Sequence, residues 1–174
     1  MAIDKIQSES INLADNFAFT GTVTGAGESN VPYFRSGLAS LQQIGTGGSY
    51  TKLNLSNEVF DSASAYDTSN YRWTPQTAGK YFVYGCATMY QGASTMRWGD
   101  ILLAKNGSGF ARAGNDYSNN YGYSIKPTVC GIIDLNGSTD YVELYARGYS
   151  GGTNVEVEAG NTHTYFGGYL ISTT

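Results

Sequence analysis

Short runs of alternating side chains, separated by glycine-rich turns, make up most of this chain. The most apolar run covers residues 78–90, where Tyr81 and Val83 alternate with Phe82 and Tyr84. Aromatic and β-branched residues favour strands, in which successive side chains point to opposite faces. A strand at the surface of a two-layer sandwich normally shows one polar face, but both faces of this run are apolar. We therefore expect an interior strand whose second face meets another sheet, another subunit or a covering loop.

Further strand-like runs lie along the rest of the chain. They cover residues 33–39, 50–55, 58–60, 71–75, 97–105, 123–135, 140–147, 154–158 and 163–172, with a weaker strand within 107–122. Asn106-Gly107 and Asn136-Gly137 are dipeptides that favour tight hairpin turns. No helix longer than a turn or two is indicated. The pattern predicts an all-β domain of roughly eight to ten strands, a sandwich or jelly roll.

Residues 1–31 have a different pattern. Their apolar positions are Ile3, Ile6, Ile11, Leu13, Phe17 and Phe19, and a glycine-rich hinge follows at 25–27. This segment is too short to form its own core, so it is either a disordered terminus or an arm that orders on a partner or threads through a trimer. We favour the arm, because the two phenylalanines would be costly to leave in water. The chain then divides into an anchoring arm, 1–31, and a head, 32–174.

Composition fits either an all-β chain with many turns or a surface buried in an assembly. Charged residues make up 14% of the chain, against about 25% in typical domains. The 15 tyrosines offer large contact areas with polar tips, which suits surfaces between proteins.

The net charge of −4 and the pI of about 4.8 argue against a nucleic acid partner, which requires clustered basic residues. No apolar run is long enough to cross a membrane as a helix, and the first residues lack the apolar stretch of a secretion signal. We expect synthesis in the cytoplasm and no membrane insertion.

Both cysteines lie in apolar strand-like runs. If the strands of Cys86 and Cys130 are neighbours, a disulfide is geometrically open to them, but buried free thiols suit a protein made in the cytoplasm better. Neither belongs to a Cys-x-x-Cys pair, so a zinc or redox site has no support.

Candidate catalytic groups are few. His163 has no nucleophile or orienting carboxylate that the sequence identifies. The pairs Asp61 with Asp67 and Glu156 with Glu158 could serve glycoside hydrolysis, but solvated loop and strand faces explain them better. We expect no enzymatic activity.

Five segments, taken in order, resemble the globular head of the superfamily that unites complement subcomponent q and tumour necrosis factor. They are Phe60-Asp61, Tyr71-Arg72-Trp73-Thr74-Pro75 with Ala78-Gly79-Lys80-Tyr81-Phe82, Leu103 with Lys105-Asn106-Gly107, Leu135-Asn136-Gly137 with Asp140-Tyr141-Val142-Glu143-Leu144, and Phe166-Gly167-Gly168-Tyr169-Leu170. The resemblance covers about residues 34–172. It implies a ten-stranded jelly roll that forms a homotrimer through aromatic-rich faces.

The resemblance also suggests site residues. The aromatic residues assigned to the trimer interface are Phe82, Tyr84, Tyr90, Tyr145, Phe166 and Tyr169. Some family members bind calcium through carboxylate and carbonyl oxygens, for which Asp100, Asp116 and Asp140 are conceivable ligands. No spacing selects these three, and we expect no metal or other cofactor.

The leader carries a second resemblance. No collagen-like repeat precedes the head, and Asn70 stands where the family often has glycine. Residues 1–8 and 15–21 instead look like the leaders of such heads among structural proteins of tailed bacteriophages. This implies a virion component: a trimeric capsid decoration (a cement protein or head fibre) or a tail-fibre tip, fastened through its arm to major capsid or tail proteins.

A host-receptor or glycan-binding adhesin is the alternative function. Tyr117, Tyr121 and Tyr149 lie among asparagines and glycines, where they could stack on sugars of a host surface. The rim of any protein interface has a similar composition.

Overall fold

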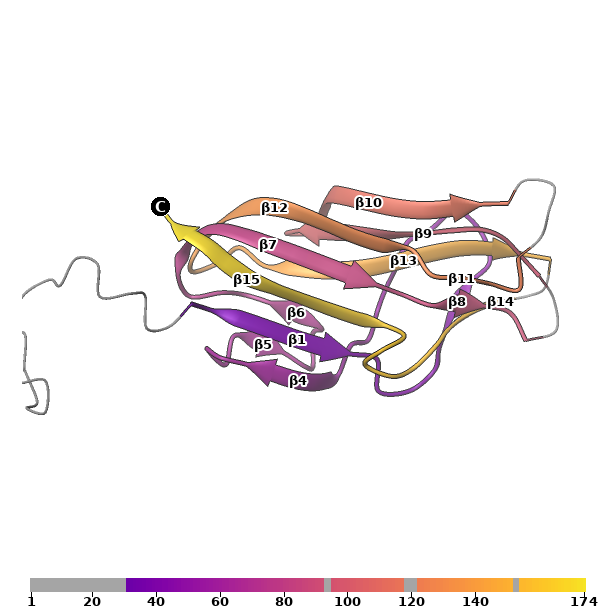
Figure 1. Cartoon of the computed structure of the whole chain (residues 1–174), viewed down its shortest axis with the longest axis horizontal. Coiled ribbons are helices and arrows are strands. Elements are labelled where there is room, and N and C mark those ends of the chain that lie inside the picture. Colours follow the sequence, from indigo (N-terminus) through magenta and orange to yellow (C-terminus); the bar gives the residue numbers. More distant parts are fainter. Residues whose placement is uncertain (1–30, 93–94, 118–121, 152–153) are drawn as a thin grey trace, which may run out of the picture.

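The computed structural model describes residues 31–92, 95–117, 122–151 and 154–174, which form an antiparallel β-sandwich without a helix (Figure 1). The prediction of an all-β domain is confirmed. The arm's candidate anchoring residues lie outside the described part. Within that part, the search for a helix able to span a membrane finds none.

Two sheets placed end to end form the front layer. The five-stranded sheet runs, in spatial order, β12 (Thr128–Asn136), β7 (Ala78–Cys86), β15 (Tyr165–Thr173), β1 (Tyr33–Gly37) and β4 (Asn57–Asp61). The four-stranded sheet runs β11 (Ser124–Ile125), β8 (Met89–Tyr90), β14 (Asn154–Val157) and β2 (Gln42–Gly45). Each of its strands adjoins in sequence a strand of the larger sheet, in the same order. The small sheet therefore prolongs the larger one.

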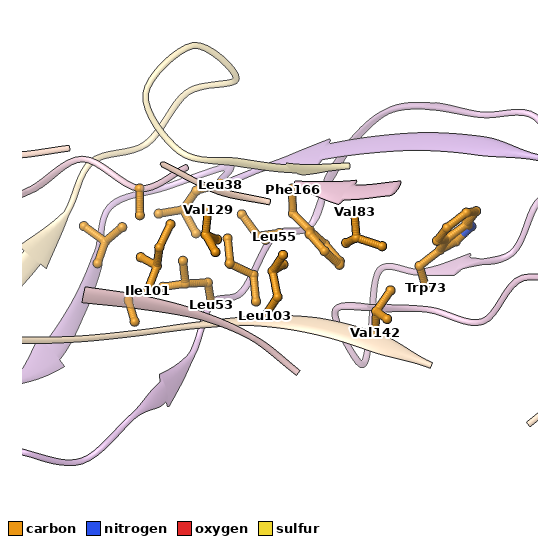
Figure 2. Packing of buried hydrophobic residues seen from close by; sticks show 14 of the residues in the cluster. Leu38, Leu53, Leu55, Trp73, Val83, Ile101, Leu103, Val129, Val142 and Phe166 are labelled. Carbon is orange, nitrogen blue, oxygen red and sulfur yellow. The ribbon is translucent and has the colours of Figure 1, made fainter. Parts of the chain in front are cut away.

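A third sheet forms the back layer. It runs β10 (Ser108–Asp116), β9 (Met96–Lys105), β13 (Val142–Ser150), β6 (Arg72–Trp73) and β5 (Tyr66–Asp67), with β3 (Thr51–Lys52) paired to β13. The apolar faces of the two layers meet, and Figure 2 shows Phe166, Val83 and Trp73 pointing into the space between them.

Interlocking aromatic rings fill one end of this core. The ring of Phe34 lies 4.4 Å from Trp73, 5.2 Å from Tyr66 and 4.9 Å from Phe166, measured between centroids. All four side chains are buried. Because Phe34 and Phe166 belong to the front layer and the other two to the back layer, the cluster joins the layers.

The run at 78–90 is an interior strand, as predicted, but it is not continuous. β7 lies between β12 and β15, and it ends at Cys86 before β8 begins at Met89. The predicted strand at 123–135 is likewise divided, between β11 and β12, where Pro127 lacks the N–H that a ladder needs.

The two Asn-Gly dipeptides have different structures. Asn106 and Gly107 both have positive φ, 52° and 79°, and join β9 to β10 as a tight hairpin, which confirms the prediction there. The second prediction is wrong, because five residues separate β12 from β13. The side-chain oxygen of Asn136 accepts hydrogen bonds from the backbone N–H groups of Ser138, Thr139 and Asp140, which stabilises this longer loop.

Asp140 links both turns. Its carboxylate accepts hydrogen bonds from the side-chain amide of Asn106 at 2.7 Å and the backbone N–H of Asn136 at 3.0 Å, and it pairs with Lys105 at 2.8 Å. The hydrogen bonds from Lys105 and Asn106 lower the pKa of Asp140. The Asp140 carboxylate therefore holds the β9–β10 turn and the β12–β13 loop together at one end of the molecule.

Replacing Phe34 with alanine should lower the free energy of unfolding by about 3 to 5 kcal/mol, because it leaves a cavity against three buried rings. Urea denaturation followed by circular dichroism measures this. Leu41→Ala, at a residue that is 44% exposed, is the control and should change stability by no more than about 0.5 kcal/mol. Similar values for the two variants would contradict the described core.

Asp140→Asn should lower the free energy of unfolding by about 1 kcal/mol at neutral pH, since it removes the negative charge that Lys105 and Asn106 bind and leaves one acceptor oxygen in place of two. Because the folded-state pKa of Asp140 is lowered, its stabilisation is present above the ordinary aspartate value of about 3.9 and is lost as pH falls through the folded-state pKa. Unfolding curves at several pH values should converge in acid. Asp134→Asn, in an exposed pair with Lys80, should have little effect at any pH.

Candidate functional site

Five apolar side chains lie side by side across the outer surface of the five-stranded sheet. Ile132 is opposite Phe82, Phe82 opposite Tyr169, and Tyr169 opposite Tyr33. The ring of Phe60 on β4 completes the series, 5.5 Å from that of Tyr33. We call these five residues the apolar row. Ile132 is 61% exposed and Tyr169 45%, so the row presents to solvent a surface that an antiparallel sheet normally makes polar.

Aromatic groups continue beside the row. Tyr84 lies opposite Gly167, and a Cβ at that glycine would overlap the Tyr84 ring. The missing side chain lets the ring lie against the sheet, and burial raises the pKa of the Tyr84 hydroxyl. The guanidinium of Arg35 lies 4.4 Å from the ring centre of Tyr165 and donates a hydrogen bond to the carbonyl of Asn161. This outer surface therefore combines neighbouring rings with the Arg35 cation, and the ion pair of Lys80 with Asp134 lies beside the row on the same face.

The structure brings together three of the six predicted interface residues, Phe82, Tyr84 and Tyr169. Tyr90 lies on β8 of the four-stranded sheet. Tyr145 lies on β13, in the back layer, where its hydroxyl donates to Glu143. These two residues do not belong to the apolar row.

The assignment of Phe166 to the interface is wrong. Its side chain has no exposed surface and packs against Phe34 in the core of the single chain. Phe166 and Tyr169 are three residues apart, and in a strand an odd separation places side chains on opposite faces. Phe166 therefore points inward and Tyr169 outward.

Sequence reasoning missed Tyr33, Phe60 and Ile132. Alternation along 123–135 puts Ile132 on the same face as Cys130, but no sequence signal says that this face lies beside β7. Pairing of β12 with β7 is a long-range property of the fold. The same applies to Tyr33, which reaches the row through β15.

The two cysteines are free thiols. Cys86 is buried, as expected, whereas Cys130 is exposed on the outer surface opposite Tyr84, so the expectation that both are buried is wrong for Cys130. Cys86 is paired in register with Thr128 instead.

Of the three conceivable calcium ligands, Asp100 and Asp116 line the same hollow of the back layer, and Asp140 does not. Asp140 is bound to Lys105, and Asp100 forms a two-pronged ion pair with Arg147 at 2.9 and 3.1 Å. Asp116 lies at the end of β10. Among the described residues, no three histidine, cysteine or carboxylate side chains lie close enough to hold a metal.

The remaining candidate groups have structural partners. His163 lies 3.1 Å from the carboxylate of Glu158 at the surface. Asp61 accepts hydrogen bonds from the backbone of Ala63 and Tyr66 in a turn. Asp67 caps the following turn in the same way, through the backbone N–H groups of residues 69 and 70, which together with the Asn70 side chain lower its pKa.

The three tyrosines proposed for ligand contact have different environments. Tyr149 lies in strand β13 rather than in a loop, and its ring is parallel to that of Trp98 at 6.3 Å. Tyr117 follows β10, and its backbone N–H donates to the carbonyl of Arg97. Tyr121 lies outside the described residues.

Comparison by sequence finds no matching family model and no matching curated protein. Comparison by structure finds many similar folds. They include murine APRIL at pH 8.0 (TM-score 0.62, 9% identity, 81% of this chain and 99% of that one), Eiger TNF from S. frugiperda (0.58, 7%, 83% and 93%), and the globular domain of zebrafish complement 1qA protein (0.57, 14%, 83% and 99%).

These likenesses agree with the order of motifs in the sequence and with the two-layer topology. The described head accordingly has the jelly-roll fold shared by tumour necrosis factor-like proteins and the globular head of complement 1q.

Proposed function

We propose that this protein is a non-enzymatic, cofactor-independent virion component whose jelly-roll head is a homotrimer and whose first 31 residues attach it to other virion proteins. The apolar row carries the first half of the proposal. Burying apolar surface stabilises a complex by roughly 25 cal/mol for each Å² removed from water. We propose that neighbouring copies of the same chain bury the apolar row.

A closed ring of three copies suits this surface. A head-to-tail contact between identical chains either closes into a ring or continues as a filament. The family resemblance given above implies a homotrimer, which favours closure at three. Tyr84, Tyr165 and Arg35 border the row and would supply the hydrogen bonds and ring contacts of its rim.

The attachment half of the proposal rests on the leader and on where the head begins. Pro32 is buried, and its carbonyl accepts a hydrogen bond from the N–H of Leu170. The start of β1 and the C-terminus lie at the same end of the sandwich (Figure 1). An arm leaving there would place the opposite end, with β8, β11 and β14, away from the particle. Purified particles imaged by electron microscopy should then show threefold knobs.

A second candidate function is an adhesin module for a host surface. One observation favours it: the back layer carries a polar hollow with an aromatic wall, described in the next subsection. The two functions are compatible, since a decoration or fibre tip can also bind a receptor.

Phe82→Asp and Tyr84→Asp should each convert the trimer to monomer or aggregate. Closing the interface over an unpaired carboxylate would weaken association by roughly a hundredfold or more. Light scattering after size exclusion measures the mass of the particle in solution.

Ile132→Asp tests the same surface with little risk to the fold, because this side chain is largely exposed in the single chain. Tyr123→Asp, at a residue that is 73% exposed and outside the row, is the matched control and should remain trimeric. If the row variants stay soluble trimers, the interface has been assigned to the wrong surface.

Deleting residues 1–30 should leave a folded trimer that no longer joins the particle. Val31 and Pro32 pack against the head, so the deletion keeps both residues. Mass spectrometry of purified particles, made with full-length or shortened protein, measures incorporation. Finding the full-length protein absent from particles would remove the virion function, and equal incorporation of both forms would remove the role of the arm.

A further inference from the structure

A hollow of about 440 Å³ lies on the outer surface of the back layer, within the range of volumes typical of small-ligand sites. Its lining residues are Gly48, Trp98, Gly99, Asp100, Arg112, Gly114, Asn115, Asp116 and Arg147. On β9, Ile101 and Leu103 point into the core, so Trp98 and Asp100 point outward. The hollow is therefore on the opposite surface from the apolar row.

A glycine keeps this hollow open. Gly114 on β10 lies opposite Asp100 on β9. A Cβ at position 114 would come within 2.5 Å of the Asp100 Cβ and 2.9 Å of the Gly99 carbonyl oxygen, closer than such atoms approach. The sheet surface is consequently bare at a point where strands normally carry a side chain, and the exposed backbone forms part of the floor.

Asp100 and Arg147 form a fixed polar wall. The guanidinium donates two hydrogen bonds to the Asp100 carboxylate and a third, from Nη1, to the carbonyl of Gly48 at 3.0 Å. It also lies 4.5 Å from the ring centre of Tyr50. The two side chains are only 13% and 24% exposed. Their orientations are set before any ligand arrives, which reduces the conformational entropy that the side chains lose on binding.

The Tyr50 hydroxyl is enclosed beside this pair. It finds no properly aligned hydrogen-bond partner among the described residues. Burial and the neighbouring Asp100 raise the pKa of Tyr50, so the hydroxyl keeps its proton. Tyr50 therefore packs on Arg147 beside the hollow and supports the polar wall, without lining the hollow itself.

Trp98 supplies the apolar wall. Its ring is nearly parallel to that of Tyr149, at 13° and 6.3 Å, and the Arg147 guanidinium lies 5.5 Å from its centre. These two contacts hold the indole in place, and Trp98 also lines the hollow. A flat aromatic wall beside charged hydrogen-bonding groups matches a ligand with one apolar face and many hydroxyl groups.

The charges of the lining cancel. Two arginines, Arg112 and Arg147, stand against two aspartates, Asp100 and Asp116, a formal sum of zero. A phosphate or sulfate site would need a positive excess, and a cation site a negative one. The geometry points to a binding site for a neutral carbohydrate, with a pyranose ring against Trp98 and its hydroxyls bound to Asp100 and Arg112.

The position of the hollow suits recognition at a distance. It lies near the start of β9 and the ends of β10 and β13, toward the end of the sandwich away from the start of β1 (Figure 1). In the proposed trimer three such sites would face outward, and simultaneous binding would raise the overall affinity for a repeating polysaccharide. Each site is complete within one chain, so this inference does not depend on the trimer.

The test is a glycan array of neutral hexose and N-acetylhexosamine oligosaccharides together with sialylated and sulfated ones, probed with the full-length protein. The strongest neutral hit is then titrated by calorimetry. Arg112→Ala removes an exposed side chain at the rim, so folding is preserved, and should weaken binding roughly tenfold or more. Trp98→Ala should have at least as large an effect.

Two matched controls isolate the site. Arg72→Ala removes an arginine stacked on Tyr141 elsewhere on the same sheet, and Tyr123→Ala removes an exposed aromatic; both should bind as the wild type does. The Ile132→Asp chain, whose folding is at little risk, should keep the affinity of a single site, which separates failure of the trimer from failure of this inference. An array without neutral hits, hits confined to anionic glycans, or affinity unchanged in Arg112→Ala and Trp98→Ala would each overturn it.

Discussion

The aromatic cluster between the layers constrains the rest of the structure. Once the ring of Phe34 is fixed against Trp73 and Phe166, the period of two in each strand decides where the neighbouring side chains point. Tyr33 must face outward because Phe34 faces inward, and Phe82 must face outward because Tyr81 is buried. The apolar row is thus a direct consequence of how the core is filled.

The two outer surfaces have opposite chemistry for the same reason. In the back layer, burial of Ile101 and Ala146 turns Asp100 and Arg147 outward, where they meet across paired strands. One outer surface of the sandwich therefore carries the apolar row. The other is polar and hollowed.

Irregular positions give the sandwich its shape. The breaks between β7 and β8 and between β11 and β12 divide the front layer, and Pro127 stands at one of them. At the other end, Asp140 holds two connections together through Asn106 and Asn136. One end of the sandwich is thereby held by local hydrogen bonds, and the breaks divide the front layer into its two sheets.

The sequence by itself determined the strand content, the hairpin at Asn106-Gly107 and the alternation of each strand, because these depend on residues close together in the chain. It also carried enough ordered motifs to indicate the jelly roll. The odd number of positions between Phe166 and Tyr169 is enough to place their side chains on opposite faces of the strand. Tertiary structure decided which strands are neighbours: the apolar row needs five separate strands side by side, and the hollow needs Asp100 on β9 between Gly114 on β10 and Arg147 on β13. Most of these pairings join residues tens of positions apart, and the pairing of Gly114 with Asp100 depends on a bulge within the β9–β10 hairpin. No local pattern of side chains encodes them.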